Sequence, residues 1–173
     1  MPKKGVEKMD KSGDFRDQMV AILPRLRRFA YSLTASVERA DDLVQAACER
    51  ALSREHQWRP GTRLDSWMFR IIYTLWIDEA RAMRNRKAHL PLEEVGLPAS
   101  ADGKARKIEA RLMLGKVVQA MEKLSPKDRL ILSLVCVDGM SYKDAAETLK
   151  VPLGTVMSRL ARARQRLYAM VNG

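Results

Sequence analysis

The sequence of 173 residues contains few of the residue types from which catalytic and metal sites are built. It has two cysteines, Cys48 and Cys136, far apart in the chain, and two histidines, His56 and His89. Their spacing matches no Cys/His zinc site, so we expect both cysteines to be small buried apolar residues in a reducing compartment. No nucleophile–base–acid set, glycine-rich phosphate loop or metal constellation is present. The sequence therefore argues against an enzyme and predicts no catalytic residue, metal, cofactor or small-molecule substrate.

Long apolar runs are also missing. The best run, Ile131 to Val137, is interrupted by Ser133 and is far shorter than the roughly 20 residues that span a bilayer. The first residues, "MPKKGVEKMDKSGDF", are basic but lack the apolar stretch of a signal peptide. We therefore expect no membrane insertion and a cytoplasmic location.

Acidic residues are too few to balance the basic ones. The chain has 21 Asp and Glu against 32 Lys and Arg, which gives a formal net charge of +11, and 46% of its residues are hydrophobic. The apolar share is enough for a folded core. The excess of positive charge favours nucleic acid or an anionic membrane as a partner, without choosing between them.

Apolar residues recur with helical periodicity almost throughout, and no convincing strand alternation is present. We expect an all-α protein of two small helical domains, at residues 14–88 and 108–173. The stretch between them, "LPLEEVGLPASADGKARK", has two prolines, two glycines and little apolar content, so residues 89–107 are expected to form a flexible linker. Residues 1–13 are expected to be disordered.

The second domain has the pattern of a helix-turn-helix. Ser125 and Ser141 are placed to cap two successive helices, and Pro126 suits the first helical position. A short turn at 150–154 then precedes a longer basic helix. On that helix the apolar residues fall on one side, and a polar stripe falls on the other: Thr155, Ser158, Arg159, Arg162 and Arg166. Such a stripe suits a DNA major groove, and its alternative, a solvated basic face, is disfavoured by the capped helix and turn before it.

The first domain contains an amphipathic stretch with an unusual polar side. In "RADDLVQAACERALS" the apolar face is made by Leu43, Val44, Ala47, Cys48 and Ala51, and the exposed stripe by Asp41, Asp42, Gln45 and Glu49. Acidic residues near a helix start are also expected from the helix dipole. A whole acidic-polar stripe in so basic a chain favours a protein-binding surface.

The next stretch, after the turn at Pro60-Gly61, is the most aromatic of the chain. Asp65 or Ser66 can cap a helix that runs to about Arg86, and this helix carries four aromatic residues and a basic end: Trp67, Phe69, Tyr73, Trp76, Arg81, Arg84, Arg86 and Lys87. Aromatic rings interleaved with cations can stack unpaired bases. The alternative is that the rings belong to the core, which we expect for Phe69 and Trp76.

Together the two domains resemble a bacterial RNA polymerase sigma factor of the extracytoplasmic-function (ECF) subfamily of the sigma-70 family. "ADDLVQAACERAL" resembles region 2.2, and "GTRLDSWMFRIIYTLWIDEARAMRNRK" resembles regions 2.3 and 2.4. "LSPKDRLILSLVCVDGMSYKDAAETLKVPLGTVMSRLARARQRL" resembles region 4. The segments occur in the family's order with a linker between them. The opening, "PRLRRFAYSLTASVERADDLVQ", is also similar to sigma factors of the alphaproteobacterial general-stress type.

The resemblance implies three partners: core RNA polymerase, promoter DNA and an anti-sigma factor. Asp41, Asp42, Gln45 and Glu49 would dock on the β′ clamp helices of the polymerase, which also contacts sigma factors through its β subunit. The −10 element would be bound and melted by the loop at 59–65 and the helix after it, with Arg63, Trp67, Arg70, Thr74, Asp78, Arg81 and Arg84. The −35 element would be read through Ser158 and Arg162, with Thr155, Arg159 and Arg166 nearer the phosphates.

Two positions depart from the family pattern. Many members have Asn at the position of Thr74 and Arg or Lys at that of Met157, so the −10 contact and the −35 preference can differ here. Met157 can instead offer apolar contact to a thymine methyl group.

Two other functions compete with this interpretation. A free-standing helix-turn-helix regulator would dimerise on paired half-sites, yet no dimerisation helix is evident. A sigma-like mimic that sequesters an anti-sigma factor would be expected with a receiver domain, and we expect none after Gly173.

Overall fold

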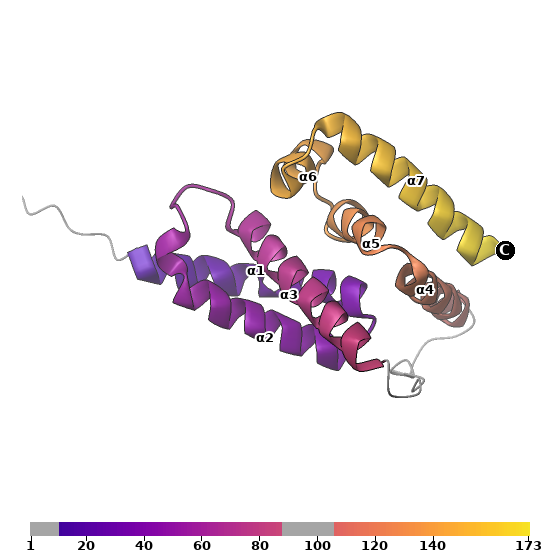
Figure 1. Cartoon of the computed structure of the whole chain (residues 1–173), viewed down its shortest axis with the longest axis horizontal. Helices are drawn as coiled ribbons and strands as arrows, with labels where there is room; N and C mark the ends of the chain where they lie inside the picture. Colours follow the sequence, from indigo (N-terminus) through magenta and orange to yellow (C-terminus); the bar gives the residue numbers. More distant parts are fainter. Residues whose placement is uncertain (1–10, 88–105) are drawn as a thin grey trace, which may run out of the picture.

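The structure, a computed structural model, describes residues 11–87 and 106–173. Within these ranges the chain consists of helices and connecting turns, without a strand, which confirms the all-α prediction (Figure 1). The N-terminal bundle contains α1 (Lys11–Thr34), α2 (Val37–Ser53), the short 3₁₀ helix η1 (Glu55–Gln57) and α3 (Leu64–Lys87). The C-terminal bundle contains α4 (Arg106–Lys123), α5 (Pro126–Leu132), the π-helical turn η2 (Ser133–Val137), α6 (Tyr142–Leu149) and α7 (Leu153–Asn172).

Aromatic rings fill the centre of the N-terminal bundle. Phe29 of α1 and Phe69 of α3 are buried, with their ring centroids 4.6 Å apart. Trp76 is buried too, so the expectation that Phe69 and Trp76 belong to the core is confirmed. Trp67 is half-buried and meets Phe15 edge-on, with 6.1 Å between the centroids.

Helix α2 packs its small apolar face against α1 and α3. The Ser36 hydroxyl caps the helix by accepting a hydrogen bond from the backbone N–H of Arg39 at 3.3 Å. The residues that the helix buries are Ala40, Leu43, Val44, Ala47 and Ala51, which include four of the five expected from the sequence. The fifth, Cys48, is half-buried, and that burial raises the pKa of its thiol.

The caps predicted for the C-terminal bundle are confirmed. The Ser125 and Ser141 hydroxyls accept hydrogen bonds from the N–H groups of Asp128 and Asp144, at 3.2 and 3.0 Å. Helix α6 ends at Leu149 and is followed by Lys150, whose φ of 53° places it in the left-handed region. Helix α7 then begins at Leu153 and buries Val156, Leu160 and Ala163, while Leu167 is half-buried.

Cys136 corrects the expectation for the cysteines, because it is exposed. It lies in η2, where the wider π-helical turn shifts the side chains relative to α-helical spacing. Leu134 takes the buried position, and the Cys136 sulfur lies at the surface, where Arg164 donates to it at 3.6 Å.

The two bundles are docked on one another. Helix α1 contacts α4, α5 and η2, and α3 contacts α6, so one continuous apolar core runs through both bundles. Two hydroxyl pairs bridge the contact: Ser32 donates to Ser133 at 2.7 Å, and Thr148 donates to Ser66 at 2.9 Å. The sequence left the relative placement of the bundles open, and the structure supplies it.

Charged pairs reinforce this docking. We use the name latch for five charged residues at the interface between the bundles: Arg25, Arg63, Asp65, Asp138 and Asp144. Arg25 of α1 lies 2.8 Å from the Asp138 carboxylate and 3.1 Å from that of Asp65. Arg63 lies 2.9 Å from Asp65 and 2.6 Å from Asp144. Asp65 thus pairs with both arginines inside the N-terminal bundle. Each arginine also pairs with an aspartate of the C-terminal bundle.

Some expectations concern residues outside the described ranges. The linker at 89–107 lies almost wholly there, apart from the start of α4 at Arg106. The disorder expected for residues 1–13 also falls mostly outside, and α1 begins at Lys11.

The left-handed backbone at Lys150 generates a stability prediction. The left-handed region costs a residue with a Cβ about 1 kcal/mol or more, whereas glycine adopts it freely. Lys150→Gly is therefore expected to raise the free energy of unfolding by about 1 kcal/mol, measured by urea denaturation. Lys150→Ala, which keeps the Cβ, is the control, and an equal gain in both variants would contradict the explanation.

The latch generates a pH prediction. Burial alone would raise the pKa of Asp65, but hydrogen bonds from Arg63 and from the Ser66 N–H lower it overall. Hydrogen bonds from Arg63 and Ser141 likewise lower the pKa of Asp144. An aspartate whose pKa is lowered by folding stabilises the folded protein. This stabilisation is fully present above the ordinary aspartate pKa of 3.8, and it is lost as the pH falls through the pKa of the folded state.

We expect the urea midpoint to fall as the pH drops below about 4, and to fall less steeply in Asp65→Asn. Identical pH profiles for the two proteins would show that Asp65 is not a source of this stability.

Candidate nucleic-acid and polymerase interfaces

The polar stripe of α7 lies opposite the face that this helix buries. Ser158 and Arg162 are exposed, and Thr155 and Arg159 are half-buried. The bonds that Ser158 and Arg162 make are local, to the carbonyls of Thr155 at 3.3 Å and of Ser158 at 3.2 Å. Both side chains therefore stay on the surface, where their donors can reach a base edge or a phosphate.

Arg166, the last member of the stripe, has an internal partner. Its guanidinium forms an ion pair with the buried carboxylate of Asp128 at the start of α5. This pair ties α7 to α5 inside the C-terminal bundle. A phosphate contact by Arg166 must therefore compete with a structural one, which the spacing in the sequence could not reveal.

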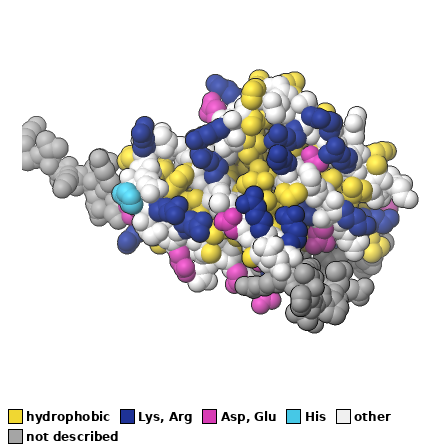
Figure 2. Space-filling model, viewed as in Figure 1, with side chains coloured by type: hydrophobic (Ala, Val, Ile, Leu, Met, Phe, Trp, Pro, Cys, Tyr) yellow, Lys and Arg dark blue, Asp and Glu magenta, His cyan; other side chains and the backbone are white. Residues whose placement is uncertain are grey.

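Helix α3 carries the residues expected to face the −10 DNA. Its exposed residues form a band along the helix: Arg70, Thr74, Asp78, Arg81 and Arg84. Figure 2 shows Lys and Arg side chains spread over both bundles on the visible face of the molecule. A surface of this charge attracts a polyanion and positions its backbone.

A cavity of about 790 Å³ opens beside the loop before α3. Trp58, Arg59, Arg63 and Trp67 line it, and α6 closes the opposite side with residues that include Thr148. The loop turns at Gly61, whose φ of 84° glycine adopts freely. Cations and indole rings around a cavity suit an unstacked base, which needs a stacking surface and hydrogen-bond donors.

Trp58 is a residue of this cavity that the sequence analysis did not select. Its side chain is buried, and its indole Nε1–H has no hydrogen-bond partner among the described residues. Buried N–H donors are usually satisfied, so a lone one beside a cavity is available to a ligand. The sequence held one sign of this role: Trp58 directly precedes the turn Arg59-Pro60-Gly61.

The acidic-polar stripe of α2 is exposed along its whole length, at Asp41, Asp42, Gln45 and Glu49. Two members have neighbours: Asp41 accepts from Arg27 of α1 at 2.7 Å, and Gln45 donates to Glu49 at 3.1 Å. Arg27 and Asp41 are both well exposed, so this ion pair adds little stability. The stripe remains a polar surface that a basic partner can contact.

The docked bundles bring part of α3 beside the C-terminal bundle. Burial raises the pKa of the Tyr73 hydroxyl on α3, and the positive charges of Arg159 on α7 and Arg81 on α3 oppose that rise. A second cavity, of about 540 Å³, lies between Thr74, Asp78 and Arg81 on one side and the start of α5 on the other. The C-terminal bundle thus stands over part of the face expected to meet −10 DNA.

Two features are absent from residues 11–87 and 106–173. No group of three or more His, Cys, Asp or Glu side chains is placed to hold a metal ion. Likewise, none of the helices there combines the length and apolar character needed to cross a membrane.

Comparisons with known proteins match each bundle to a family description of its own. The family description "Sigma-70, region 4" matches residues 114–167, and "Sigma2 domain of PhyR" matches residues 19–73. The ECF RNA polymerase sigma factor EcfG of Rhodopseudomonas palustris is 34% identical over 163 residues, which cover 94% of this chain and 88% of that protein.

Solved structures agree. The sigma factor RpoE from Bartonella quintana, solved in complex with the anti-sigma factor NepR, is 29% identical with a TM-score of 0.74, over 91% of this chain and 96% of that one. CnrH, solved with the cytosolic domain of CnrY, shares the fold at 24% identity and a TM-score of 0.64, over 93% and 89% of the two chains. The identity with EcfG over nearly the whole chain shows that this protein belongs to the ECF RNA polymerase sigma factors of the sigma-70 family.

Proposed function

We propose that this ECF sigma factor divides promoter recognition between its two bundles. ECF sigma factors bind core RNA polymerase and direct it to promoters with −35 and −10 elements. Here residues 14–88 would dock on the polymerase and open the −10 element, and residues 108–173 would read the −35 element. Residues 89–107 would link the two, and residues 1–13 would stay outside both.

The observation that carries this proposal is the geometry of α7. A helix that buries Val156, Leu160 and Ala163 presents Ser158 and Arg162 to solvent from the opposite side. It follows a capped helix and a tight turn, as a recognition helix does. Ser158 and Arg162 would reach base edges, and Thr155 and Arg159 would hold phosphates, joined by Arg166 when its pair with Asp128 opens.

The −10 part of the proposal rests on the α3 band and the cavity beside it. Arg70, Thr74, Asp78, Arg81 and Arg84 would follow the DNA, and Arg63 and Trp67 would help hold a base taken out of the stack in the cavity. Unstacking a base costs a few kcal/mol, which ring stacking and the free Trp58 N–H can offset.

The α2 stripe would dock on the β′ clamp helices of the polymerase, with further contact to β. Its support is an exposed acidic-polar surface on a protein whose net charge is +11. The protein would act in the cytoplasm as a non-enzymatic subunit. An anti-sigma factor would control it in a stress response, as suggested by a relative solved with its anti-sigma factor.

Transcription with purified components tests the proposal. Core polymerase plus this protein is expected to start transcripts on promoter fragments that share two motifs at a fixed spacing. DNA binding by the protein alone, without transcripts, would instead support a free-standing regulator. Capture of an anti-sigma factor without transcripts would support a sigma-like mimic. The regulator is not favoured, because the relatives matched over most of the chain are sigma factors.

Arg162→Ala is expected to weaken −35-dependent initiation by about 1–3 kcal/mol, the contribution of a bidentate base contact. Arg164→Ala is the matched control, because it removes the same side chain from the same helix on the side away from the stripe. Abortive-initiation rates on promoters with intact and scrambled −35 elements measure the effect. An equal loss of initiation rate in both variants would show that Arg162 does not contact a base of the −35 element.

Asp42→Arg is expected to weaken binding to core polymerase by about tenfold or more, because it reverses a charge at the centre of the α2 stripe without disturbing the core. The control is Asp17→Arg, the same charge change at an exposed position of α1. Affinity for fluorescently labelled core enzyme measures it. An unchanged affinity for Asp42→Arg would exclude this docking surface.

A further inference from the structure

Two large apolar side chains are exposed at the start of α7. Leu153, the first residue of the helix, is 47% exposed, and Met157 is 52% exposed. Residues four positions apart are neighbours on a helix surface, so the two form one surface, which we call the apolar edge. Neither residue belongs to the core that the described residues form. Packing inside the protein therefore does not explain them.

The apolar edge borders the polar stripe of α7. Each residue advances about 100° around a helix, so Met157 and Arg159 lie on either side of Ser158, which points away from the buried face. The neighbours of Met157 on the exposed side, Gly154 and Ala161, are small. A Cβ at Gly154 would meet no atom within 4 Å. Met157 therefore projects beyond its neighbours, and the helix backbone can approach a partner closely at this end.

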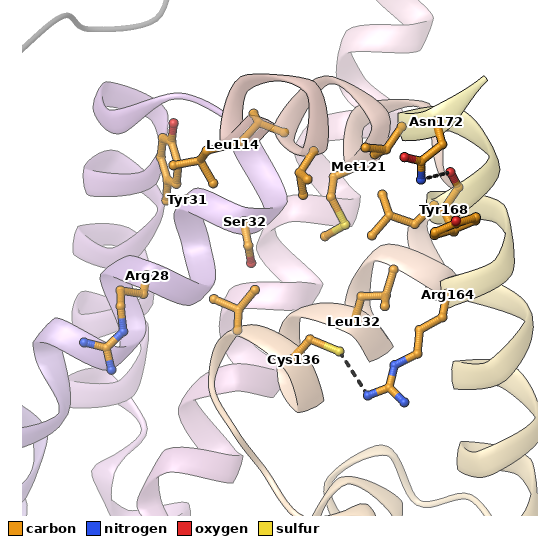
Figure 3. A pocket seen from close by; sticks show the side chains of 15 residues that line it. Arg28, Tyr31, Ser32, Leu114, Met121, Leu132, Cys136, Arg164, Tyr168 and Asn172 are labelled. Carbon is orange, nitrogen blue, oxygen red and sulfur yellow. Dashed lines mark hydrogen bonds between the residues drawn. The ribbon is translucent and has the colours of Figure 1, made fainter. Parts of the chain in front are cut away.

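The next cation on this side of α7 has a partner within the protein. Arg164 follows Met157 by seven residues, or about two turns, and so lies on the same side of the helix. Its guanidinium donates to the Cys136 sulfur at 3.6 Å, and Figure 3 shows the side chain directed toward that sulfur. The apolar edge thus offers apolar contact without a charge of its own, whereas the stripe beside it offers hydroxyls and guanidinium groups.

The chemistry of the DNA major groove determines what such an edge can bind. Most groups that base pairs present there are hydrogen-bond donors and acceptors, and thymine alone presents a methyl group. A recognition helix contacts base edges through its N-terminal residues, and Met157 is the fifth residue of α7. The thioether side chain of methionine is flexible and adapts to the shape of an apolar surface. Met157 is therefore suited in both position and chemistry to contact a thymine methyl group.

We propose that the apolar edge reads a thymine of the −35 element through its 5-methyl group, with Met157 in contact and Leu153 beside it. This inference rests on the proposed reading of the −35 element by α7. It adds a residue that discriminates between bases without a hydrogen bond, and it names the base.

Deoxyuridine tests the contact, because it differs from thymidine only by the missing methyl group. A −35 element is first selected from a randomised library by transcription with core polymerase and this protein, and its thymines on both strands are then replaced. Initiation by the unaltered protein is expected to fall about fourfold, the contribution of one buried methyl group. Met157→Ala is expected to lose a similar factor on the thymine promoter and nothing further on the deoxyuridine promoter.

Met170→Ala is the matched control. It makes the same change on the same helix at a residue that is 43% exposed and lies about 20 Å further along the axis. This variant is expected to keep the full dependence on the methyl group. Affinity for core polymerase without DNA is expected to be unaltered in Met157→Ala. A loss of that affinity would make the apolar edge a polymerase contact and would overturn the proposal.

Met157→Arg provides a second readout. Arginine pairs with guanine through two hydrogen bonds, so the library selection is expected to lose its thymine preference at one position and to favour guanine there. An identical selected element for both proteins would overturn the proposal, as would an equal effect of deoxyuridine on the unaltered protein and Met157→Ala. The reading of −35 bases by Ser158 and Arg162 would survive either result. If scrambling the −35 element leaves initiation unchanged, the proposed reading by α7 is itself contradicted.

Discussion

The arrangement of this protein depends on a buried arginine between its two bundles. Arg129 of α5 donates to the carbonyl of Leu33 at 2.7 Å, in the last turn of α1, and its guanidinium lies 5.3 Å from the centre of the Trp76 ring on α3. Burial lowers the pKa of this guanidinium from its ordinary value. A helix C-terminus and an aromatic face both favour a cation. A buried cation is costly without such partners, so Arg129 fixes where α5 can dock.

Because the bundles dock around Arg129, some residues expected to contact the promoter also take part in contacts within the protein. Arg63, expected to act in promoter opening, is held by Asp65 and by Asp144 of the other bundle. Part of the α3 band, which is expected to contact −10 DNA, faces the start of α5 across a cavity. The C-terminal bundle therefore covers part of the face proposed to bind −10 DNA, and we infer that the proposed promoter contacts need the bundles to separate.

Local features of this structure could be predicted from the sequence, whereas contacts between distant residues could not. Ser125, Ser141 and the apolar positions of α7 act within a few residues of themselves, so spacing was enough to place them. Arg25 and Asp138 are 113 positions apart, and no pattern in the sequence joins them. The expectation that Cys136 is buried was wrong, because the π-helical turn shifts its side chain away from the position that α-helical spacing predicts. The exposure of the α2 and α7 stripes follows from helical periodicity, but the internal partners of Arg63 and Arg166 do not.

One cross-link tests the central claim, that the bundles must separate for initiation. The hydroxyls of Ser32 and Ser133 are 2.7 Å apart across the interface, so cysteines at these positions are within reach of a disulfide. The variant Ser32→Cys/Ser133→Cys is made with Cys48 and Cys136 changed to serine, and transcription with core polymerase is measured before and after reduction. We predict that the oxidised protein initiates at least about tenfold less than the reduced protein. Equal initiation by the oxidised and reduced forms would contradict the claim.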